Sequence, residues 1–227
     1  ILPTATPYAR NALFSGLFPG EIAARHPDWW GERDDEALNA HEKDLLVAQL
    51  AALQHPAPVR YQKLTTAADS DDLERHLPAA IAGDGVHAFV FNFVDMLTHG
   101  RSESMILFEV ARDEMALRAL TRQWFERSAL FSLLKEASRR NIAVVVTSDH
   151  GALHCNTPAT VFAKRDATAN LRYKFGEDIR AERPEQALLF SNPDDLRLPH
   201  RTPGTNTLLA AGDTFFVYPT KLREYQG

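Results

Sequence analysis

Two segments of the chain place an aspartate and a histidine directly after a run of strand-forming residues. These runs cover residues 86–94 and 142–148. The pairs at their ends are Asp95 with His99 and Asp149 with His150. Carboxylate oxygen and imidazole nitrogen both ligate zinc, and parallel strands present their carboxyl ends at one edge of a sheet, where open α/β proteins bind ligands. The two segments therefore predict a two-metal site built from oxygen and nitrogen donors.

The two pairs differ in what the backbone must do to bring their side chains together. Asp95 and His99 are four residues apart, so both can reach one ion if the chain turns helical there. The alternative is that Asp95 caps a helix and His99 is an ordinary surface histidine. Adjacent residues of a strand point to opposite faces, so Asp149 and His150 require a sharp bend, which Gly151 would ease.

A threonine stands at the start of the first expected helix. Thr6 lies just before residues 8–16, which have helical composition and end at a glycine suited to a C-terminal cap. The amino terminus of a helix favours an anion, so a phosphate held there would meet the Thr6 hydroxyl, a candidate nucleophile and metal ligand. The alternative is that this hydroxyl only caps the helix. Asn11 is a candidate donor to a phosphate oxygen, against an ordinary capping or surface role.

A basic and aromatic stretch follows much later, with Arg172 and Lys174 on either side of Tyr173. The two cations are candidate phosphate contacts, and the ring could stack on a base or sugar. The alternative is a solvated basic turn. His154 and Cys155 lie close to His150 in sequence, but we expect them to be loop packing residues.

The remaining pattern predicts the elements that position these residues. We expect helices at 34–53, from a cap at Ser70 to about Ala82, at 102–122 and at 128–140, and strands at 59–64, 86–94, 142–148 and 213–219. Helices between the two metal-bearing strands predict a right-handed crossover and hence an α/β fold with a parallel sheet. The proline-containing region from Thr157 to Pro203 predicts an irregular, substrate-shaping insertion.

Size and composition narrow the class of protein. The chain has 227 residues, 44% of them hydrophobic and 24% charged, which is typical of one globular domain. A net charge of −5 argues against a long nucleic acid or an anionic membrane surface as partner. A single cysteine, Cys155, excludes an internal disulfide and favours a cytoplasmic location. No apolar stretch reaches bilayer length, and the start without Met predicts a fragment cut at both ends.

Taken in order along the chain, these motifs resemble a known family. A Pro-x-x-Thr turn, an Asp-x3-His and a Ser-Asp-His-Gly together resemble the alkaline phosphatase superfamily and, within it, the PglZ domain. The resemblance covers essentially the whole chain, and the residue sequence further resembles the output domain of PorX-type response regulators. The segments that carry the resemblance are Leu2–Gly16, Asn92–His99, Thr147–Gly151 and Asn170–Lys174.

The resemblance implies a fold and a set of residue roles. The fold would be an alkaline-phosphatase-like three-layer sandwich with a mostly parallel central sheet, here a PglZ fragment over residues 1–227. Thr6 would be the nucleophile, with Asp149 and His150 on one zinc and Asp95 and His99 on the second. The family also uses an Asp at the end of the first strand and a late His. We expect these two ligands beyond Ile1 and Gly227, so that two Zn²⁺ are bound in the full-length domain.

The implied activity is hydrolysis of a phosphoric ester by in-line attack of Thr6 on phosphorus, with a phosphodiester favoured over a monoester. The expected substrate is a small phosphodiester or an oligonucleotide. As a response regulator output domain linked to secretion, the chain would be controlled by a sensor kinase through a receiver domain. The resemblance also allows a homodimer. The alternative is a non-catalytic zinc-containing interaction or dimerisation module. A sulfatase is excluded, because its nucleophile turn is C/S-x-P-x-R whereas this chain has Thr4-Ala-Thr-Pro-Tyr.

Overall fold

The computed structural model describes residues 1–31, 39–163 and 170–218. The chain divides into two compact units. We call Ile1–Ala52 together with the segment from Ser148 onward the split unit, and Leu53–Thr147 the middle unit. Thr6, Asp149 and His150 belong to the split unit, whereas Asp95 and His99 belong to the middle unit. Each unit is described by itself.

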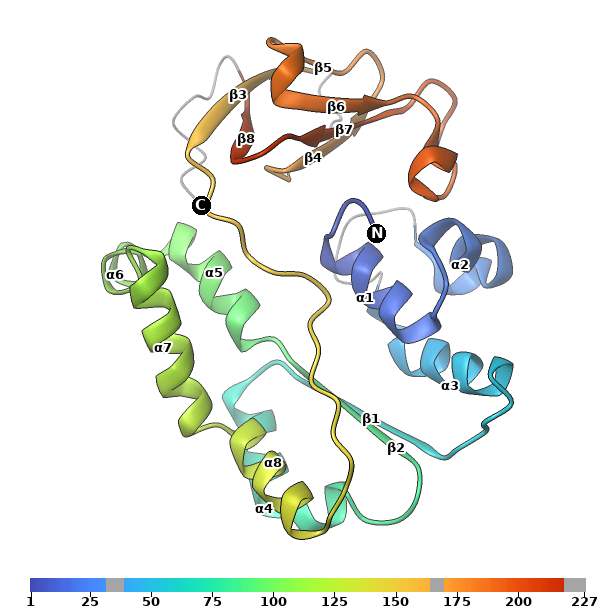
Figure 1. Cartoon of the computed structure of the whole chain (residues 1–227), viewed down its shortest axis with the longest axis vertical. Helices are drawn as coiled ribbons and strands as arrows, with labels where there is room; N and C mark the ends of the chain where they lie inside the picture. Colours follow the sequence, from blue (N-terminus) through green and yellow to red (C-terminus); the bar gives the residue numbers. More distant parts are fainter. Residues whose placement is uncertain (32–38, 164–169, 219–227) are drawn as a thin grey trace. The chain divides into compact units, whose positions relative to one another are not determined.

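The middle unit contains a parallel pair of strands (Figure 1). These strands are β1 (Val59–Leu64) and β2 (Val86–Phe91). Their register runs from Val59 opposite Val86 to Leu64 opposite Phe91, which confirms the two predicted strands, although β2 ends three residues early. Gly85 precedes β2 with φ at 131°, and a Cβ there would come within 2.2 Å of the Pro58 carbonyl oxygen. Only glycine fits this close approach between the chains entering the two strands.

The middle unit's described helices are α4 (Ala67–Ala80), α5 (Phe93–Glu103), α6 (Met105–Val110), α7 (Glu114–Glu126) and α8 (Ala129–Arg139). All of these described helices except α5 begin where a short polar side chain accepts from a free backbone N–H group. The predicted cap at Ser70 is wrong, because Thr66 accepts from the Asp69 N–H and Asp69 closes a reciprocal capping box. The predicted helix over 102–122 is instead split by caps at Ser104 and Asp113. The prediction of 128–140 is confirmed by α8, whose cap is Ser128.

A small core joins the strands to the helices in this unit. Leu64 of β1, Leu73 of α4 and Ala129 of α8 are buried together. Phe89 and Phe91 of β2 pack against them. Apolar burial of this kind, at roughly 25 cal/mol per Å², is what holds the two helices on the sheet.

The strand predicted over residues 142–148 does not form. The segment is extended but carries no strand pairing, and Val145 is 90% exposed. Val and Ile favour extended backbone, yet a strand also requires the edge of a neighbouring strand for its hydrogen bonds, and that pairing cannot be read from local sequence. Asp149 and His150 are therefore not held by the end of a strand.

The split unit contains two three-stranded sheets where the sequence predicted an irregular insertion (Figure 1). One has the order β5-β3-β8 and the other β4-β7-β6. The strands are β3 (Thr157–Phe162), β4 (Tyr173–Gly176), β5 (Arg180–Ala181), β6 (Ala187–Phe190), β7 (Asn206–Ala210) and β8 (Thr214–Val217). The predicted strand over 213–219 is confirmed as β8, with residue 219 outside the described residues. The predicted three-layer sandwich around one central sheet is not confirmed.

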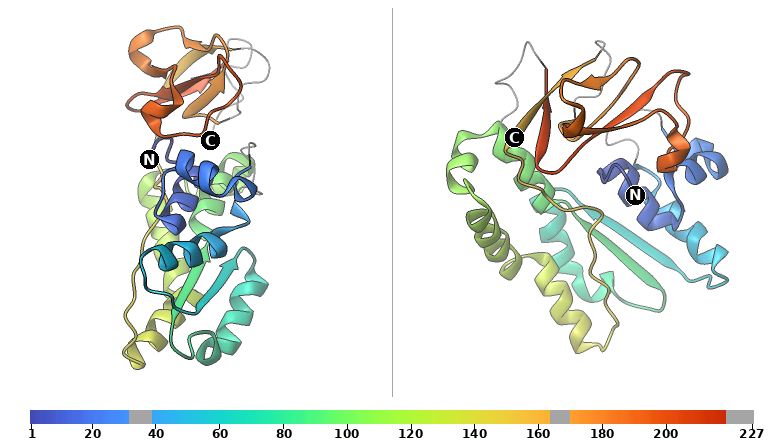
Figure 2. Two further views of the ribbon diagram at one scale, coloured as in Figure 1. Left: turned by 90° about the vertical axis from the view of Figure 1, so that its right-hand side faces the viewer. Right: turned by 45° about the horizontal axis from the view of Figure 1, so that its top comes forward.

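Helices of the split unit lie beside one another in the views of Figure 2, where α1 packs against α3. The helical elements are α1 (Thr6–Ser15), α2 (Pro19–Arg25), α3 (Glu42–Ala52) and the short 3-10 turns η1 (Pro27–Trp29), η3 (Pro184–Gln186) and η4 (Pro193–Leu196). The predicted helix over 34–53 is observed as α3, while 32–38 lie outside the described residues. Within the described ranges, none of the helices combines the length and apolar character that a bilayer crossing demands.

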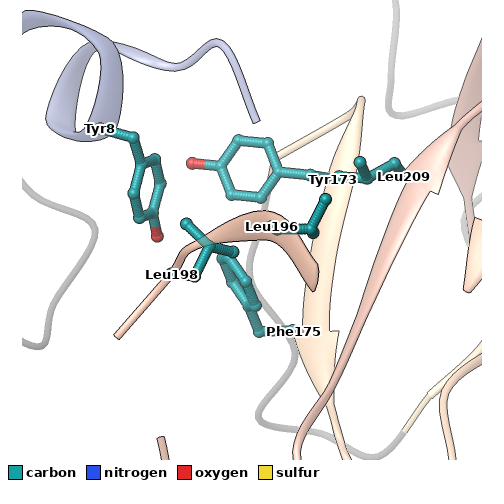
Figure 3. Close-up of a cluster of buried hydrophobic side chains, with 6 residues drawn as sticks. All are labelled: Tyr8, Tyr173, Phe175, Leu196, Leu198 and Leu209. Atoms are coloured by element: carbon teal, nitrogen blue, oxygen red, sulfur yellow. The ribbon is translucent and has the colours of Figure 1, made fainter. Parts of the chain in front are cut away.

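Tyr8 fixes α1 to a sheet of the split unit. Figure 3 shows its ring among the buried side chains of Tyr173, Phe175, Leu196, Leu198 and Leu209. Tyr173 meets the Tyr8 ring edge-on at a centroid distance of 6.1 Å. The Tyr8 hydroxyl also accepts a hydrogen bond from Arg201 at 2.9 Å. This anchor sets the position of Thr6, half a turn earlier on the same helix.

Candidate active site

The Thr6 hydroxyl contacts the imidazole of His150. Thr6 Oγ1 lies 2.8 Å from His150 Nε2, although 144 residues separate them. The alternative that Thr6 caps its helix is not observed, because Ala5 is the N-cap residue of α1 and no side chain makes a capping bond there. The hydroxyl is thus directed at a distant imidazole rather than at its own helix.

The contacts of the His150 ring assign its proton. His150 Nδ1 lies 3.2 Å from the carbonyl oxygen of Gly151, which can only accept, so the proton is assigned to Nδ1. Nε2 then carries a lone pair that accepts from the Thr6 hydroxyl or ligates a metal. Gly151 lacks a positive φ and a Cβ there would meet nothing within 4 Å, so neither feature requires glycine, and its expected help to a bend stays a prediction.

A second contact joins α1 to the same dipeptide. Arg10 Nε donates to Asp149 Oδ2 at 2.9 Å, and the Arg10 side chain is only 8% exposed. Thr6 and Arg10 are one helical turn apart, so both extend from the same face of α1. The other carboxylate oxygen of Asp149 accepts from the backbone N–H of His150 at 3.1 Å. Helix α1 therefore positions both Asp149 and His150, in place of the predicted strand end.

Glu42 completes a buried group of charges. Its Oε1 lies 3.7 Å from Arg10 Nη1, and the Glu42 side chain is 1% exposed. One guanidinium thus lies between two carboxylates in a setting with little water, where their interaction is strong. Neither Arg10 nor Glu42 was predicted from the sequence. The spacing of four residues from Thr6 is the signal that could have indicated Arg10.

Asp95 and His99 meet each other on α5 of the middle unit. Asp95 Oδ1 lies 3.5 Å from His99 Nε2, and the His99 side chain is 77% exposed. The alternative that Asp95 caps the helix is not observed, because the N-cap residue of α5 is Asn92. The helical turn needed to bring this pair together is therefore present.

The predicted substrate-binding residues have structural partners in the split unit. The Asn11 amide donates to the Pro7 carbonyl at 2.9 Å and its oxygen accepts from Asn39 at 3.3 Å. Arg172 donates to the carbonyl oxygens of Gly212 and Thr214. Substrate contacts by Asn11 and Arg172 stay predictions.

The segment Tyr173–Lys174 is not a solvated turn. Both residues are buried in β4, and Lys174 is 1% exposed. The Lys174 Nζ lies 4.9 Å from the centroid of the Tyr218 ring. Burial lowers the pKa of Lys174 from 10.5 to about 8. The Tyr173 ring belongs to the core with Tyr8, so the expectation that it stacks on a nucleotide is wrong, while a substrate contact by Lys174 stays a prediction.

A comparison with protein families decides the kinship of the chain. Residues 1–220 match the model of the family described as "BREX system PglZ alkaline phosphatase-like domain". The chain belongs to the PglZ family. The family resemblance predicted from the motifs is thereby confirmed, and the α/β structure is consistent with an alkaline-phosphatase-like domain. No curated protein matches this PglZ domain significantly.

The donor atoms of the PglZ domain can be compared with the geometry of zinc. Tetrahedral zinc with bonds of about 2.0–2.1 Å sets its ligand atoms about 3.3 Å apart. The separations of 2.8 Å between Thr6 Oγ1 and His150 Nε2 and 3.9 Å between His150 Nε2 and Asp149 Oδ2 bracket that value. The 3.5 Å between Asp95 and His99 is close to it. Each group therefore fits part of a zinc coordination sphere.

The ligand count is a separate matter from the fit of the distances. Across the described residues, no three or more histidine, cysteine, aspartate or glutamate side chains gather as a potential metal site. Thr6, Asp149 and His150 supply three donors only when the hydroxyl is counted, and α5 supplies two. Zinc bound by either group would take further ligands from water, substrate or other residues.

Proposed function

We propose that this PglZ domain is a zinc-dependent phosphoester hydrolase with Thr6 as its nucleophile. The single observation that carries the proposal is the 2.8 Å contact between Thr6 Oγ1 and His150 Nε2 at the amino terminus of α1. A threonine with only a structural role at this position would be expected to cap the helix with its hydroxyl. The Thr6 hydroxyl instead contacts an imidazole that can ligate a metal. Membership of an alkaline phosphatase-like family supports the same reaction class.

The chain's own residues would divide the work as follows. Thr6 Oγ1 attacks phosphorus in line, forming a phosphothreonine as the bond to the leaving oxygen breaks, and water then cleaves the new bond to release phosphate or a monoester and restore Thr6. The Arg10 contact ties the Asp149 carboxylate to the same helix that carries Thr6. Zinc held by Thr6, Asp149 and His150 would lower the pKa of the Thr6 hydroxyl and neutralise charge on phosphoryl oxygens. Asp95 and His99 would hold a second ion.

Substrate and context belong to the same proposal. A small phosphodiester, such as a nucleotide diester, is favoured over a monoester, as expected from the resemblance to PorX-type output domains. By that resemblance the domain would act in the cytoplasm under a receiver domain and its sensor kinase, in the regulation of secretion, and it could dimerise. A non-catalytic interaction module is less well supported, because such a protein has no physical need for a threonine hydroxyl directed at His150.

The test compares two threonines two residues apart. Full-length protein supplied with zinc is assayed on bis-nitrophenyl phosphate and on the nitrophenyl monoester. Thr6→Val, nearly isosteric but without the hydroxyl, should lose about 10³-fold or more in kcat, as expected when a nucleophile is removed. Thr4→Val is the matched control, since Thr4 is exposed, and should retain wild-type turnover. Equal turnover of Thr6→Val and wild type would move the protein to the non-catalytic class.

A further inference from the structure

We infer that Arg10, supported by Glu42, is a positioning residue that holds the Asp149 carboxylate in the orientation that the Thr6 site requires. The inference rests on the proposed function, because the orientation of Asp149 matters to catalysis only if Asp149 serves that site. It adds a role for two residues that contact the candidate donors through Asp149, Arg10 on α1 and Glu42 on α3.

Arg10 and Thr6 form hydrogen bonds with two consecutive residues of a segment that is distant in sequence. Thr6 contacts His150 and Arg10 contacts Asp149, at 2.8 and 2.9 Å. Because Thr6 and Arg10 are one turn apart on α1, the two contacts fix both the position of the dipeptide along the helix and the rotation of its backbone. A single contact would leave that rotation free.

The orientation of the carboxylate itself is determined by two donors. Asp149 Oδ2 accepts from Arg10 Nε, and Oδ1 accepts from the backbone N–H of His150 at 3.1 Å. A carboxylate held at both oxygens cannot rotate about its terminal torsion without losing a charge-assisted hydrogen bond. The lone pairs that remain are therefore presented in a fixed direction, which is what a metal ligand needs.

Glu42 gives Arg10 the second contact that keeps its own side chain in place. Arg10 is 8% exposed and Glu42 is 1% exposed, so neither side chain can exchange its partner for water. The guanidinium is planar, so the hydrogen bond at Nε orients its plane, and the ion pair 3.7 Å away at Nη1 favours the same orientation. A lysine ammonium at position 10 would keep the charge but not this plane.

Charge is the other property that Arg10 brings to this group. Its guanidinium is an ion-pair partner of both Asp149 and Glu42. Removal of Arg10 would take this shared positive partner from both carboxylates. Charge alone is therefore a competing explanation for Arg10, and Arg10→Lys separates charge from orientation.

The experiment measures zinc affinity by competition with a chromophoric chelator, together with kcat and KM on bis-nitrophenyl phosphate, in full-length protein. Arg10→Lys should weaken zinc binding about 10- to 100-fold, the range found when the partner of a metal ligand is removed, and should lower kcat more than KM changes. Glu42→Gln, an isosteric change, should weaken zinc binding in the same direction but less. Arg25→Lys is the matched control, since Arg25 is exposed on α2, and should bind zinc like wild type.

The outcomes separate the inference from the proposed function. Wild-type zinc affinity and kcat in both Arg10→Lys and Glu42→Gln would overturn the inference alone, provided that wild type binds zinc and Thr6→Val is inactive. Wild-type protein that takes up no zinc would overturn the proposed function and the inference with it. If Arg10→Lys does not fold, Glu42→Gln decides, because it preserves shape and removes the charge that holds the guanidinium. Wild-type zinc affinity in Arg10→Lys alone would establish a charge effect and would also overturn the inference.

Discussion

Replacing Lys174 should change how the stability of the protein depends on pH. Lys174 is 1% exposed within β4, and its Nζ lies 4.9 Å from the centre of the Tyr218 ring. Desolvation lowers its pKa from 10.5 to about 8. The substitution Lys174→Met keeps much of the length and apolar stem of the side chain while removing the titrating amine.

The sign of the effect follows from which state binds the proton. Below about pH 8, Lys174 is protonated in both states, and the folded state bears the full cost of a buried charge. Between about pH 8 and 10.5, the folded state releases the proton while the unfolded state keeps it, so the free energy of unfolding rises with pH. At ~1.4 kcal/mol per pKa unit, the gain between about pH 7 and pH 10 is roughly 2.5 kcal/mol.

The measurement is urea denaturation at several pH values between about 7 and 10, for wild type and Lys174→Met. Other groups titrate in the same range, so the informative quantity is the difference between the two unfolding free energies at each pH. The free energy of unfolding of wild type, relative to that of Lys174→Met, should rise by roughly 2.5 kcal/mol over this range. Lys43→Met, an exposed position on α3, is the control and should run parallel to wild type. Parallel curves for Lys174→Met would show that the amine is not desolvated as the structure indicates.

Two further pairs of substitutions test the local structure. Gly16→Ala should lower the free energy of unfolding by about 1–2 kcal/mol, because Gly16 ends α1 with φ at 67° and a Cβ would come within 2.6 Å of Gln49 Nε2. Gly151→Ala, without positive φ or a near neighbour, should change it by less than about 0.5 kcal/mol, and equal losses would contradict the assignment. Thr66→Ala should cost about 1 kcal/mol in thermal or urea unfolding by removing the α4 cap. Ser70→Ala should lower the free energy of unfolding by less than Thr66→Ala does. A larger loss from Ser70→Ala would support the cap that the sequence predicted.

The elements that sequence predicted correctly are those that local interactions determine. Helix α1 is specified by Pro7 in its first turn and Gly16 after its last, and α8 by the Ser128 cap. Strands β1 and β2 are short runs of strand formers bounded by turn residues, and they pair with each other. In each of these, the signal lies within a few residues of the element that it predicts.

The errors concern interactions between distant segments. Residues 142–148 have the strongest local strand preference, yet no pairing forms and Val145 is exposed. The sequence predicts Lys174 in a basic turn, yet β4 pairs with β7, whose partner residues lie 30 to 36 positions later in the chain, and Lys174 is buried there. Pairing partners are chosen by the whole chain, and a lysine stem can pack against apolar surface when its amine finds a suitable neighbour.

At the candidate site, too, the sequence indicated which residues matter but not which residues they contact. Local sequence marked all three residues: Thr6 stands at the start of an expected helix, and Asp149 and His150 follow an apolar run. Their positioning by α1 was not predicted, because arginine and glutamate on helices usually lie in solvent and carry no signal of burial. The structure identifies Arg10 and Glu42 only through their burial and their shared contact. Burying an arginine with two carboxylates carries a desolvation cost, which close and well-oriented contacts must offset. Arg10, which the sequence did not indicate, is therefore the residue whose substitution should best separate the effect of orientation from that of charge at the Thr6 site.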